Sequence, residues 1–166
     1  AHYGWQLPAD HWQRVRERQE KEFRAKLTPI PGVQEGLEYL AIPCCVASGS
    51  NMARLTSTLQ ITGLFPYFEG CIFGRECVER GKPAPDIFLY AARQMGIAPA
   101  KCLVIEDSLH GIDAAHAAGM DVWGFCGGRH FTPKRKKQFA HSGIPHVFED
   151  MRLIFDRVKE IGRAHV

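Results

Sequence analysis

The stretch Gly81–Gly119, GKPAPDIFLYAARQMGIAPAKCLVIEDSLHGIDAAHAAG, decides the fold of this sequence. It predicts a helix, a short buried strand and a second helix, with charged residues at the turns. Lys82 lies in the turn that begins the first helix, and the strand at 103–105 runs directly into Glu106 and Asp107. Adjacent carboxylates at the end of a buried strand are costly unless a cation meets them. Because ligands bind beyond the carboxyl ends of strands in open α/β sheets, this stretch predicts a site for a divalent cation with an ammonium group nearby.

The composition is that of an ordinary globular protein. The 166 residues allow one domain with a sizeable core, and 45% of them are apolar and 23% charged. The net charge of +3 is too small to indicate a nucleic-acid partner, and no apolar run is long enough to cross a membrane. The six cysteines show no C-x-x-C spacing and most lie in or beside apolar runs, so we expect buried thiols in a reducing, cytoplasmic location. Because the sequence begins without Met, we also expect a trimmed chain.

The rest of the chain predicts alternating helices and strands. A charged helix at 9–27 is followed by the breaker cluster 28–32, the best candidate for a domain boundary. Residues 64–68 are expected to form an apolar loop, and the basic run 134–137 a solvated loop or helix end. The predicted strands are too apolar to have a solvent-exposed face, which indicates a parallel sheet covered by helices on both sides. We expect strands at 42–47, 71–73, 103–105, 122–125 and 146–148, and further helices at 33–40, 52–59, 85–95, 108–118 and 151–161.

A small polar turn, Ser48-Gly49-Ser50-Asn51, links the strand at 42–47 to the next helix. Hydroxyls and free N–H groups at the start of a helix can bind a phosphate oxygen. Ser and Asn are also the residues that ordinarily cap helices, so this turn alone leaves both interpretations open.

Three features therefore occur in order along the chain: the strand that ends at Ser48, the Lys82 turn, and the strand that ends at Glu106-Asp107. The stretches ASGSN, GKPAPDIF and IEDSLHGIDAA resemble the second, third and fourth signatures of the haloacid dehalogenase (HAD) superfamily of phosphohydrolases. The likeness is greatest to its β-phosphoglucomutase-like branch and covers residues 29–125 in order. The resemblance implies an α/β fold, a Rossmann-like core with a parallel sheet flanked by helices, together with a helical cap.

The resemblance also implies a role for each matching residue. Ser48 would hydrogen-bond a phosphoryl oxygen, and Lys82 would neutralise the phosphoryl group and the nucleophile beside it. Asp107 would bind Mg²⁺, with Glu106 as a second ligand or an outer-shell partner. Mg²⁺ takes one or two carboxylates together with waters and phosphate oxygens, so these residue types agree with that ion. The phosphate side of the pocket would be lined by Gly49, Ser50 and Asn51.

The first signature of the family, an Asp-x-Asp pattern on the opening strand, has no match, because no two aspartates in the sequence are spaced by two. In the family that strand lies between the one ending at Ser48 and the one ending at Glu106. We therefore expect a gap of roughly 9–10 Å in the sheet, a nucleophile outside the printed sequence, and no activity of this chain alone. Residues 1–28 would be the end of the helical cap, and residues 29–166 an incomplete core.

These features leave several functions open. The first is a Mg²⁺-dependent phosphatase of small phosphorylated metabolites, sugar phosphates above all, that works through an aspartyl-phosphate in the full-length protein. The alternatives are a phosphosugar mutase of the β-phosphoglucomutase type and a non-catalytic binding protein that has kept the fold. A dehalogenase is disfavoured because that branch does not need paired acidic residues for a metal. A receiver domain is disfavoured because it needs acidic residues near its N-terminus. We expect no nucleic-acid or membrane partner.

Overall fold

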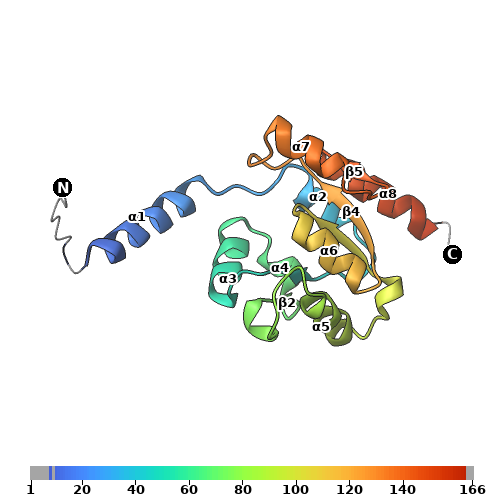
Figure 1. Cartoon of the computed structure of the whole chain (residues 1–166), viewed down its shortest axis with the longest axis horizontal. Helices are drawn as coiled ribbons and strands as arrows, with labels where there is room; N and C mark the ends of the chain where they lie inside the picture. Colours follow the sequence, from blue (N-terminus) through green and yellow to red (C-terminus); the bar gives the residue numbers. More distant parts are fainter. Residues whose placement is uncertain (1–7, 9, 164–166) are drawn as a thin grey trace, which may run out of the picture.

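Helices and strands alternate along the chain in the structure, a computed structural model that describes residue 8 and residues 10–163 (Figure 1). No helix in this described part is both long and apolar enough to cross a membrane. Two short 3-10 turns, η1 (Arg75–Cys77) and η2 (Pro99–Lys101), precede α5 and β3. The other elements are α1 (His11–Lys26), α2 (Val33–Glu38), β1 (Val46–Ala47), α3 (Met52–Ile61), α4 (Phe65–Phe68), β2 (Ile72–Phe73), α5 (Asp86–Met95), β3 (Leu103–Glu106), α6 (Leu109–Ala117), β4 (Asp121–Phe125), α7 (Pro133–Ala140), β5 (Val147–Phe148) and α8 (Met151–Arg163).

The strands form two parallel sheets. In the first, β1 pairs with β2, with Val46 opposite Ile72. In the second, β4 lies between β3 and β5, with Ile105 opposite Trp123 on one side. The predicted α/β fold with parallel strands flanked by helices is therefore confirmed. Among the described residues β1 and β3 belong to separate sheets, and a further strand between them stays a prediction.

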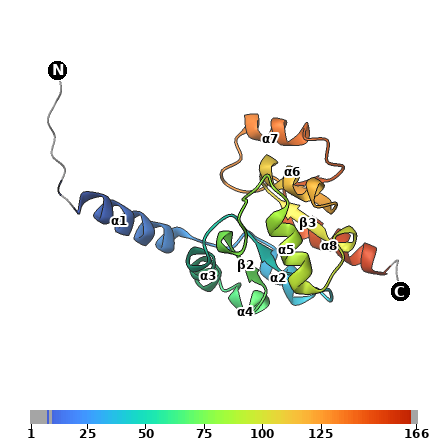
Figure 2. The ribbon, with the colours of Figure 1, turned by 60° about the horizontal axis from the view of Figure 1, so that its bottom comes forward.

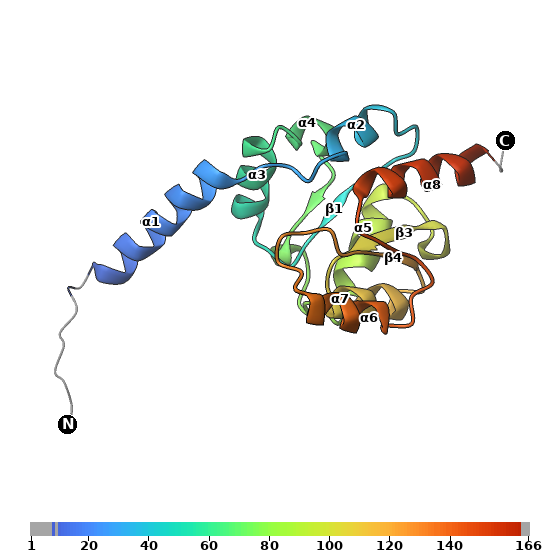
Figure 3. The same cartoon turned by 90° about the horizontal axis from the view of Figure 1, so that it is seen from above.

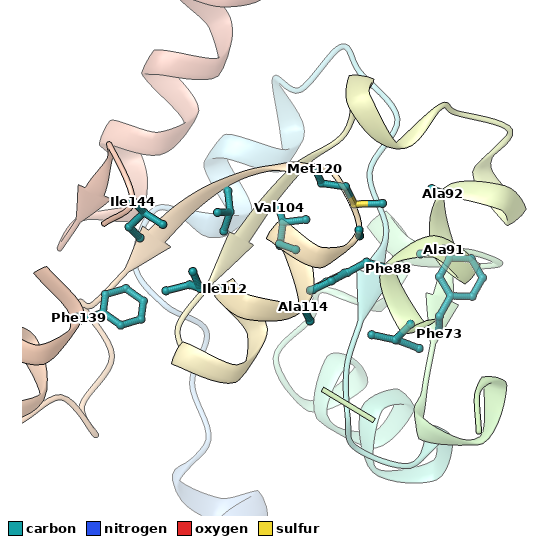
Figure 4. Packing of buried hydrophobic residues seen from close by; sticks show 14 of the residues in the cluster. Phe73, Phe88, Ala91, Ala92, Val104, Ile112, Ala114, Met120, Phe139 and Ile144 are labelled. Atoms are coloured by element: carbon teal, nitrogen blue, oxygen red, sulfur yellow. The ribbon is translucent and has the colours of Figure 1, made fainter. Parts of the chain in front are cut away.

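One face of the larger sheet packs against α5 and α6 (Figure 4). Val104 and Val122 project from β3 and β4 into this core, where α6 contributes Ala114 and Ala115, both 0% exposed. The small alanine side chains let α6 lie close to the strands, and Ile87 of α5 fills the space beside them at 2% exposure. This is the main hydrophobic core. It holds in place α5, which follows the Lys82 turn, and α6, which follows Glu106 and Asp107.

The opposite face packs against α8, which lies across β4 from α6 (Figure 3). Successive residues of a strand point to opposite faces, so Trp123 turns toward α8 where Val122 turned toward α6. Trp123 packs with Ile154, which is 2% exposed. Helix α2 covers α8 in turn, and a Cβ on Gly36 would lie 2.1 Å from the Phe155 ring. Strand β4 is therefore covered on both faces, whereas β3 leaves Leu103 and Ile105 exposed on the face away from α6.

Helix α1 extends away from the rest of the chain (Figure 2). The predicted helix at 9–27 is observed at His11–Lys26, and Trp12 is 64% exposed. Residues 1–7 and 9 of the predicted cap segment lie outside the described residues. The division into a cap remnant and a core stays a prediction.

Three local predictions differ from the structure. The predicted strand at 42–47 is reduced to Val46–Ala47, because among the described residues β1 pairs only with β2, itself two residues long. The loop predicted at 64–68 is wrong, since residues 65–68 form α4 with Pro66 in its first turn, where proline favours a helix. The basic run 134–137 lies inside α7, which begins with a proline and a Thr132 cap.

Candidate active site

Lys82 connects the ends of β1 and β3. Its ammonium group forms an ion pair with Oε1 of Glu106, at the end of β3, and donates to the carbonyl oxygen of Ala47, 3.4 Å away at the end of β1. The same ammonium lies 4.4 Å from the centre of the Phe88 ring, within the range of a cation–π contact. The Lys82 side chain is 16% exposed and that of Glu106 8%. The structure therefore brings together the Lys82 turn, the residue before Ser48 and the acidic couplet.

Glu106 is held by hydrogen bonds on its second oxygen as well. Oε2 accepts from the backbone N–H groups of Asp107 and Ser108, both at 3.0 Å, and from the Ser108 hydroxyl at 2.9 Å. The Ser108 hydroxyl accepts in turn from the Gly111 N–H at 3.0 Å and so caps α6. A Cβ on Gly111 would lie 2.0 Å from the Glu106 carboxyl carbon, so only glycine lets α6 approach this close. Both carboxylate oxygens of Glu106 are thus engaged inside the protein.

Asp107 has the opposite environment. Its side chain is 54% exposed, and Oδ2 lies 3.5 Å from Nε2 of His130. No group of three or more His, Cys, Asp or Glu among the described residues is arranged to hold a metal ion. Mg²⁺ does not need such a group, because it keeps several waters and takes one or two carboxylates with phosphate oxygens. The exposed carboxylate of Asp107 fits that requirement, whereas Glu106 fits a partner that holds Lys82.

In the polar turn after β1, Asn51 caps a helix and the Ser48 hydroxyl keeps a proton that it can donate. Oδ1 of Asn51 accepts from the Arg54 N–H at 2.8 Å, which is ordinary capping of α3. The Ser48 N–H donates to the Phe73 carbonyl oxygen at 3.0 Å, and the Ser48 hydroxyl accepts from the Ser50 N–H at 3.2 Å. A hydroxyl that accepts one bond still has its own proton to donate. Gly49 is exposed with open space around it.

Two supporting contacts around the site were missed from the sequence. The Glu76 carboxylate, from the 3-10 turn after β2, accepts from the Met52 N–H at 3.1 and 3.2 Å and so caps α3 from a distant part of the chain. Arg80 donates two hydrogen bonds to Asp86, at 3.0 and 2.7 Å, across the turn that carries Lys82. The Arg80 hydrogen bond lowers the pKa of Asp86. Asp86 could have been recognised from the sequence as an acidic residue in the first turn of a helix, where the helix dipole favours a negative charge.

Known proteins resemble this chain over much of its length. It is 33% identical over 112 residues to a phosphorylated carbohydrates phosphatase of Thermotoga maritima, a match that covers 66% of the chain and 51% of that protein. Among solved structures, a HAD family hydrolase of Deinococcus radiodurans with bound phosphate and sodium superposes with a TM-score of 0.82 at 30% identity, covering 96% of this chain and 71% of that one. A β-phosphoglucomutase-like protein of Thermotoga maritima gives a TM-score of 0.81 at 25% identity, with 95% and 72% covered.

The relatives also show how much of a whole protein this chain represents. It spans between about a quarter and a half of the length of the first curated relatives that it matches, from 26% to 51%. The family model of haloacid dehalogenase-like hydrolases matches residues 2–119, which include the Ser48 turn, Lys82 and the acidic couplet. The chain therefore belongs to the haloacid dehalogenase-like hydrolase family.

Proposed function

We propose that this chain carries the phosphate- and metal-binding half of a Mg²⁺-dependent phosphatase that acts on small phosphorylated metabolites, in particular sugar phosphates. The observation that supports it best is the position of Lys82, whose ammonium group lies between the ends of β1 and β3. Phosphoryl transfer depends mainly on positioning and on neutralising charge, and a fixed ammonium beside a hydroxyl donor and an exposed carboxylate supplies both.

Each site residue has a distinct task in this proposal. The Ser48 hydroxyl donates to a non-bridging phosphoryl oxygen, and Lys82 neutralises the charge on the phosphoryl group. Glu106 holds Lys82 in place from the outer shell, while Asp107 holds Mg²⁺. When bound, Mg²⁺ would neutralise phosphate oxygens as a Lewis acid. Gly49 leaves room for the phosphate to approach the turn.

The attacking group would come from the gap between β1 and β3. We infer that an aspartate on a strand in this gap, in a part of the full-length protein outside the printed sequence, attacks phosphorus. The bond from phosphorus to the leaving oxygen breaks, and that oxygen takes a proton from a second aspartate of the same strand acting as general acid. Water then gives a proton back to that aspartate and attacks phosphorus, so that the bond to the first aspartate breaks and phosphate is released. Without this strand the chain would bind its ligands but would not turn them over. We place the full-length enzyme in the cytoplasm, where its cysteines stay as thiols.

The test is a phosphatase assay of the full-length protein on a set of sugar phosphates, with and without Mg²⁺. Lys82→Met and Asp107→Asn should each lower kcat/KM at least about 100-fold, as the loss of a group that stabilises transition-state charge does. Asp113→Asn, on the exposed side of α6, is the matched control and should leave kcat/KM unchanged. Activity that survives Asp107→Asn with its Mg²⁺ response intact would refute the metal assignment.

The same assay separates the two alternatives. The resemblance to a β-phosphoglucomutase-like fold favours a phosphosugar mutase as the second candidate. A mutase would convert one sugar phosphate isomer into another without releasing phosphate. Binding of phosphate and Mg²⁺ without either reaction would indicate a non-catalytic binding protein.

A further inference from the structure

A pocket of about 290 Å³ lies between the start of α6 and α7, directly beside the proposed metal residue Asp107. Its apolar part includes the rings of Phe131 and Phe139, the second of which is 2% exposed. Its polar groups come from both helices: His110 from α6, and Arg135 and Gln138 from α7. The pocket therefore continues the candidate active site toward α7, with hydrogen-bond donors at the far end.

Helix α7 gives this end of the pocket a positive charge. Its sequence, PKRKKQFA, has four basic residues and no acidic one. Lys136 is neutralised by an ion pair with Glu149 at 2.5 Å. For Arg135, by contrast, no carboxylate partner exists in the part of the chain that the structure describes. An unneutralised guanidinium that lines a pocket is available to a ligand.

The guanidinium of Arg135 is also held in position. One of its N–H groups donates to the carbonyl oxygen of His130 at 3.4 Å, and its Cζ lies 5.6 Å from the centre of the Phe131 ring. Guanidinium has five N–H donors in a fixed fork, so most remain free to bind the two oxygens of a carboxylate or phosphate.

On the basis of the proposed phosphatase function, we propose that this pocket binds a second anionic group of the substrate, a carboxylate or a second phosphate. Arg135 would be the main recognition residue, and the Gln138 amide a second donor. The carboxylate of Asp107 repels an anion, so the second anionic group would bind at the α7 end. At about 30 Å³ per water molecule, the pocket has room for a carboxylate and the carbons that carry it. The enzyme would therefore prefer dianionic or acidic sugar phosphates over neutral ones.

The first test compares matched substrates of the full-length enzyme. 6-Phosphogluconate differs from glucose 6-phosphate by a carboxylate, and fructose 1,6-bisphosphate differs from fructose 6-phosphate by a phosphate. Arg135→Gln should raise KM about 10- to 100-fold for the acidic member of at least one pair, the effect of losing a charged hydrogen bond. It should leave kcat and the neutral members unchanged. The pair that responds identifies the anion.

Lys134→Gln is the control, since it removes the same charge from the same helix at an exposed residue that does not line the pocket. If Arg135→Gln and Lys134→Gln change the KM ratios equally, the effect is general electrostatic attraction and the subsite does not exist. If neither pair responds to Arg135→Gln, the inference is refuted while the phosphatase function stands.

A second measurement needs no turnover and decides the question if the full-length protein hydrolyses none of these esters. In EDTA, the acidic substrates should slow the reaction of Arg135 with phenylglyoxal, as measured by peptide mass spectrometry, and the neutral ones should not. Arg129, which is exposed and does not line the pocket, serves as the internal control in the same spectra. Equal labelling of Arg135 with and without the acidic substrates would then refute the inference.

Discussion

Glu106→Gln should destabilise the protein far more than the loss of one surface charge. The change leaves the Lys82 ammonium group in a site where its side chain is only 16% exposed. Its remaining contacts are the Ala47 carbonyl oxygen and the Phe88 ring, neither of which carries a charge. Removing one partner of a buried pair costs about 3–5 kcal/mol. Because Lys82 retains two contacts, we expect the lower end, about 3 kcal/mol.

The assay is urea and thermal unfolding of the intact protein. For a protein of this size, about 3 kcal/mol corresponds to a fall in Tm of about 6–12 °C. Trp123, which is 6% exposed, provides a fluorescence signal of the folded core. The control is Glu160→Gln, which breaks the exposed i,i+3 pair with Arg157 on α8 and should have a much smaller effect.

The double variant Lys82→Met, Glu106→Gln identifies the physical cause. Replacing Lys82 with an uncharged, apolar side chain of similar length removes the buried charge that Glu106→Gln leaves without a partner. The free energy of unfolding of the double variant should therefore exceed that of Glu106→Gln alone by about 1–3 kcal/mol, the range of coupling energies between residues in contact. If Glu106→Gln destabilises no more than Glu160→Gln, or if the second change does not restore stability, then the ion pair is not the contact that fixes Lys82.

Three further changes test the surroundings of the site. Gly111→Ala should destabilise the protein and lower phosphatase activity, because the new Cβ would displace the Glu106 carboxylate. This would hold although alanine usually favours a helix. Circular dichroism melting measures the stability, and the phosphatase assay measures the activity. Asp86→Asn should cost stability near neutral pH, because the Arg80 hydrogen bond stabilises the ionised carboxylate and lowers its pKa. The difference from the wild type should begin to shrink as pH falls through the ordinary pKa of 3.8 and vanish below the lowered pKa of the folded state. Burial raises the pKa of Cys45 to about 11, so iodoacetamide should label it slowly near neutral pH and faster as the pH approaches that value.

The outcomes that would contradict these three predictions are equally specific. If Gly111→Ala is as stable and as active as Asp113→Ala on the same helix, then the Glu106 carboxylate can move aside without cost. A difference between wild type and Asp86→Asn that persists in acid would mean that the Arg80 contact is not the cause. Rapid labelling of Cys45 near neutral pH would show that this thiol is accessible in solution.

Elements with strong end signals were predictable from the sequence to within a residue. The helix expected at 85–95 is observed at Asp86–Met95, because a proline begins its first turn and Gly96 ends it with φ +68°. The strand expected at 103–105 is observed at Leu103–Glu106 for a similar reason, since an apolar run stops at charged residues. In both cases local chemistry alone determines the boundary.

Elements whose limits depend on a distant part of the chain were not predictable in this way. The strand expected at 42–47 is mostly unpaired, and its apolar residues could not reveal how few partners it has. Helix α7 carries almost no apolar periodicity, so its charges suggested a solvated segment, and only Thr132 and the proline after it indicated a helix start. The ion pair of Arg80 with Asp86 and the capping of α3 by Glu76 likewise require the fold.

The two acidic residues at the end of β3 show why the residues of a site can be predicted when their roles cannot. Although they are adjacent in sequence, Glu106 is the last residue of β3 and Asp107 lies just outside the strand. The alternation of β3 buries Glu106, and the chain leaves the strand at Asp107, which is 54% exposed. The buried carboxylate must be neutralised, and it therefore fixes Lys82. The exposed one lies 3.5 Å from the His130 ring, and its exposure leaves it accessible to a cation. A sequence couplet that predicted one metal site thus divides into an anchor for the ammonium group and an exposed carboxylate, which we propose as the metal ligand.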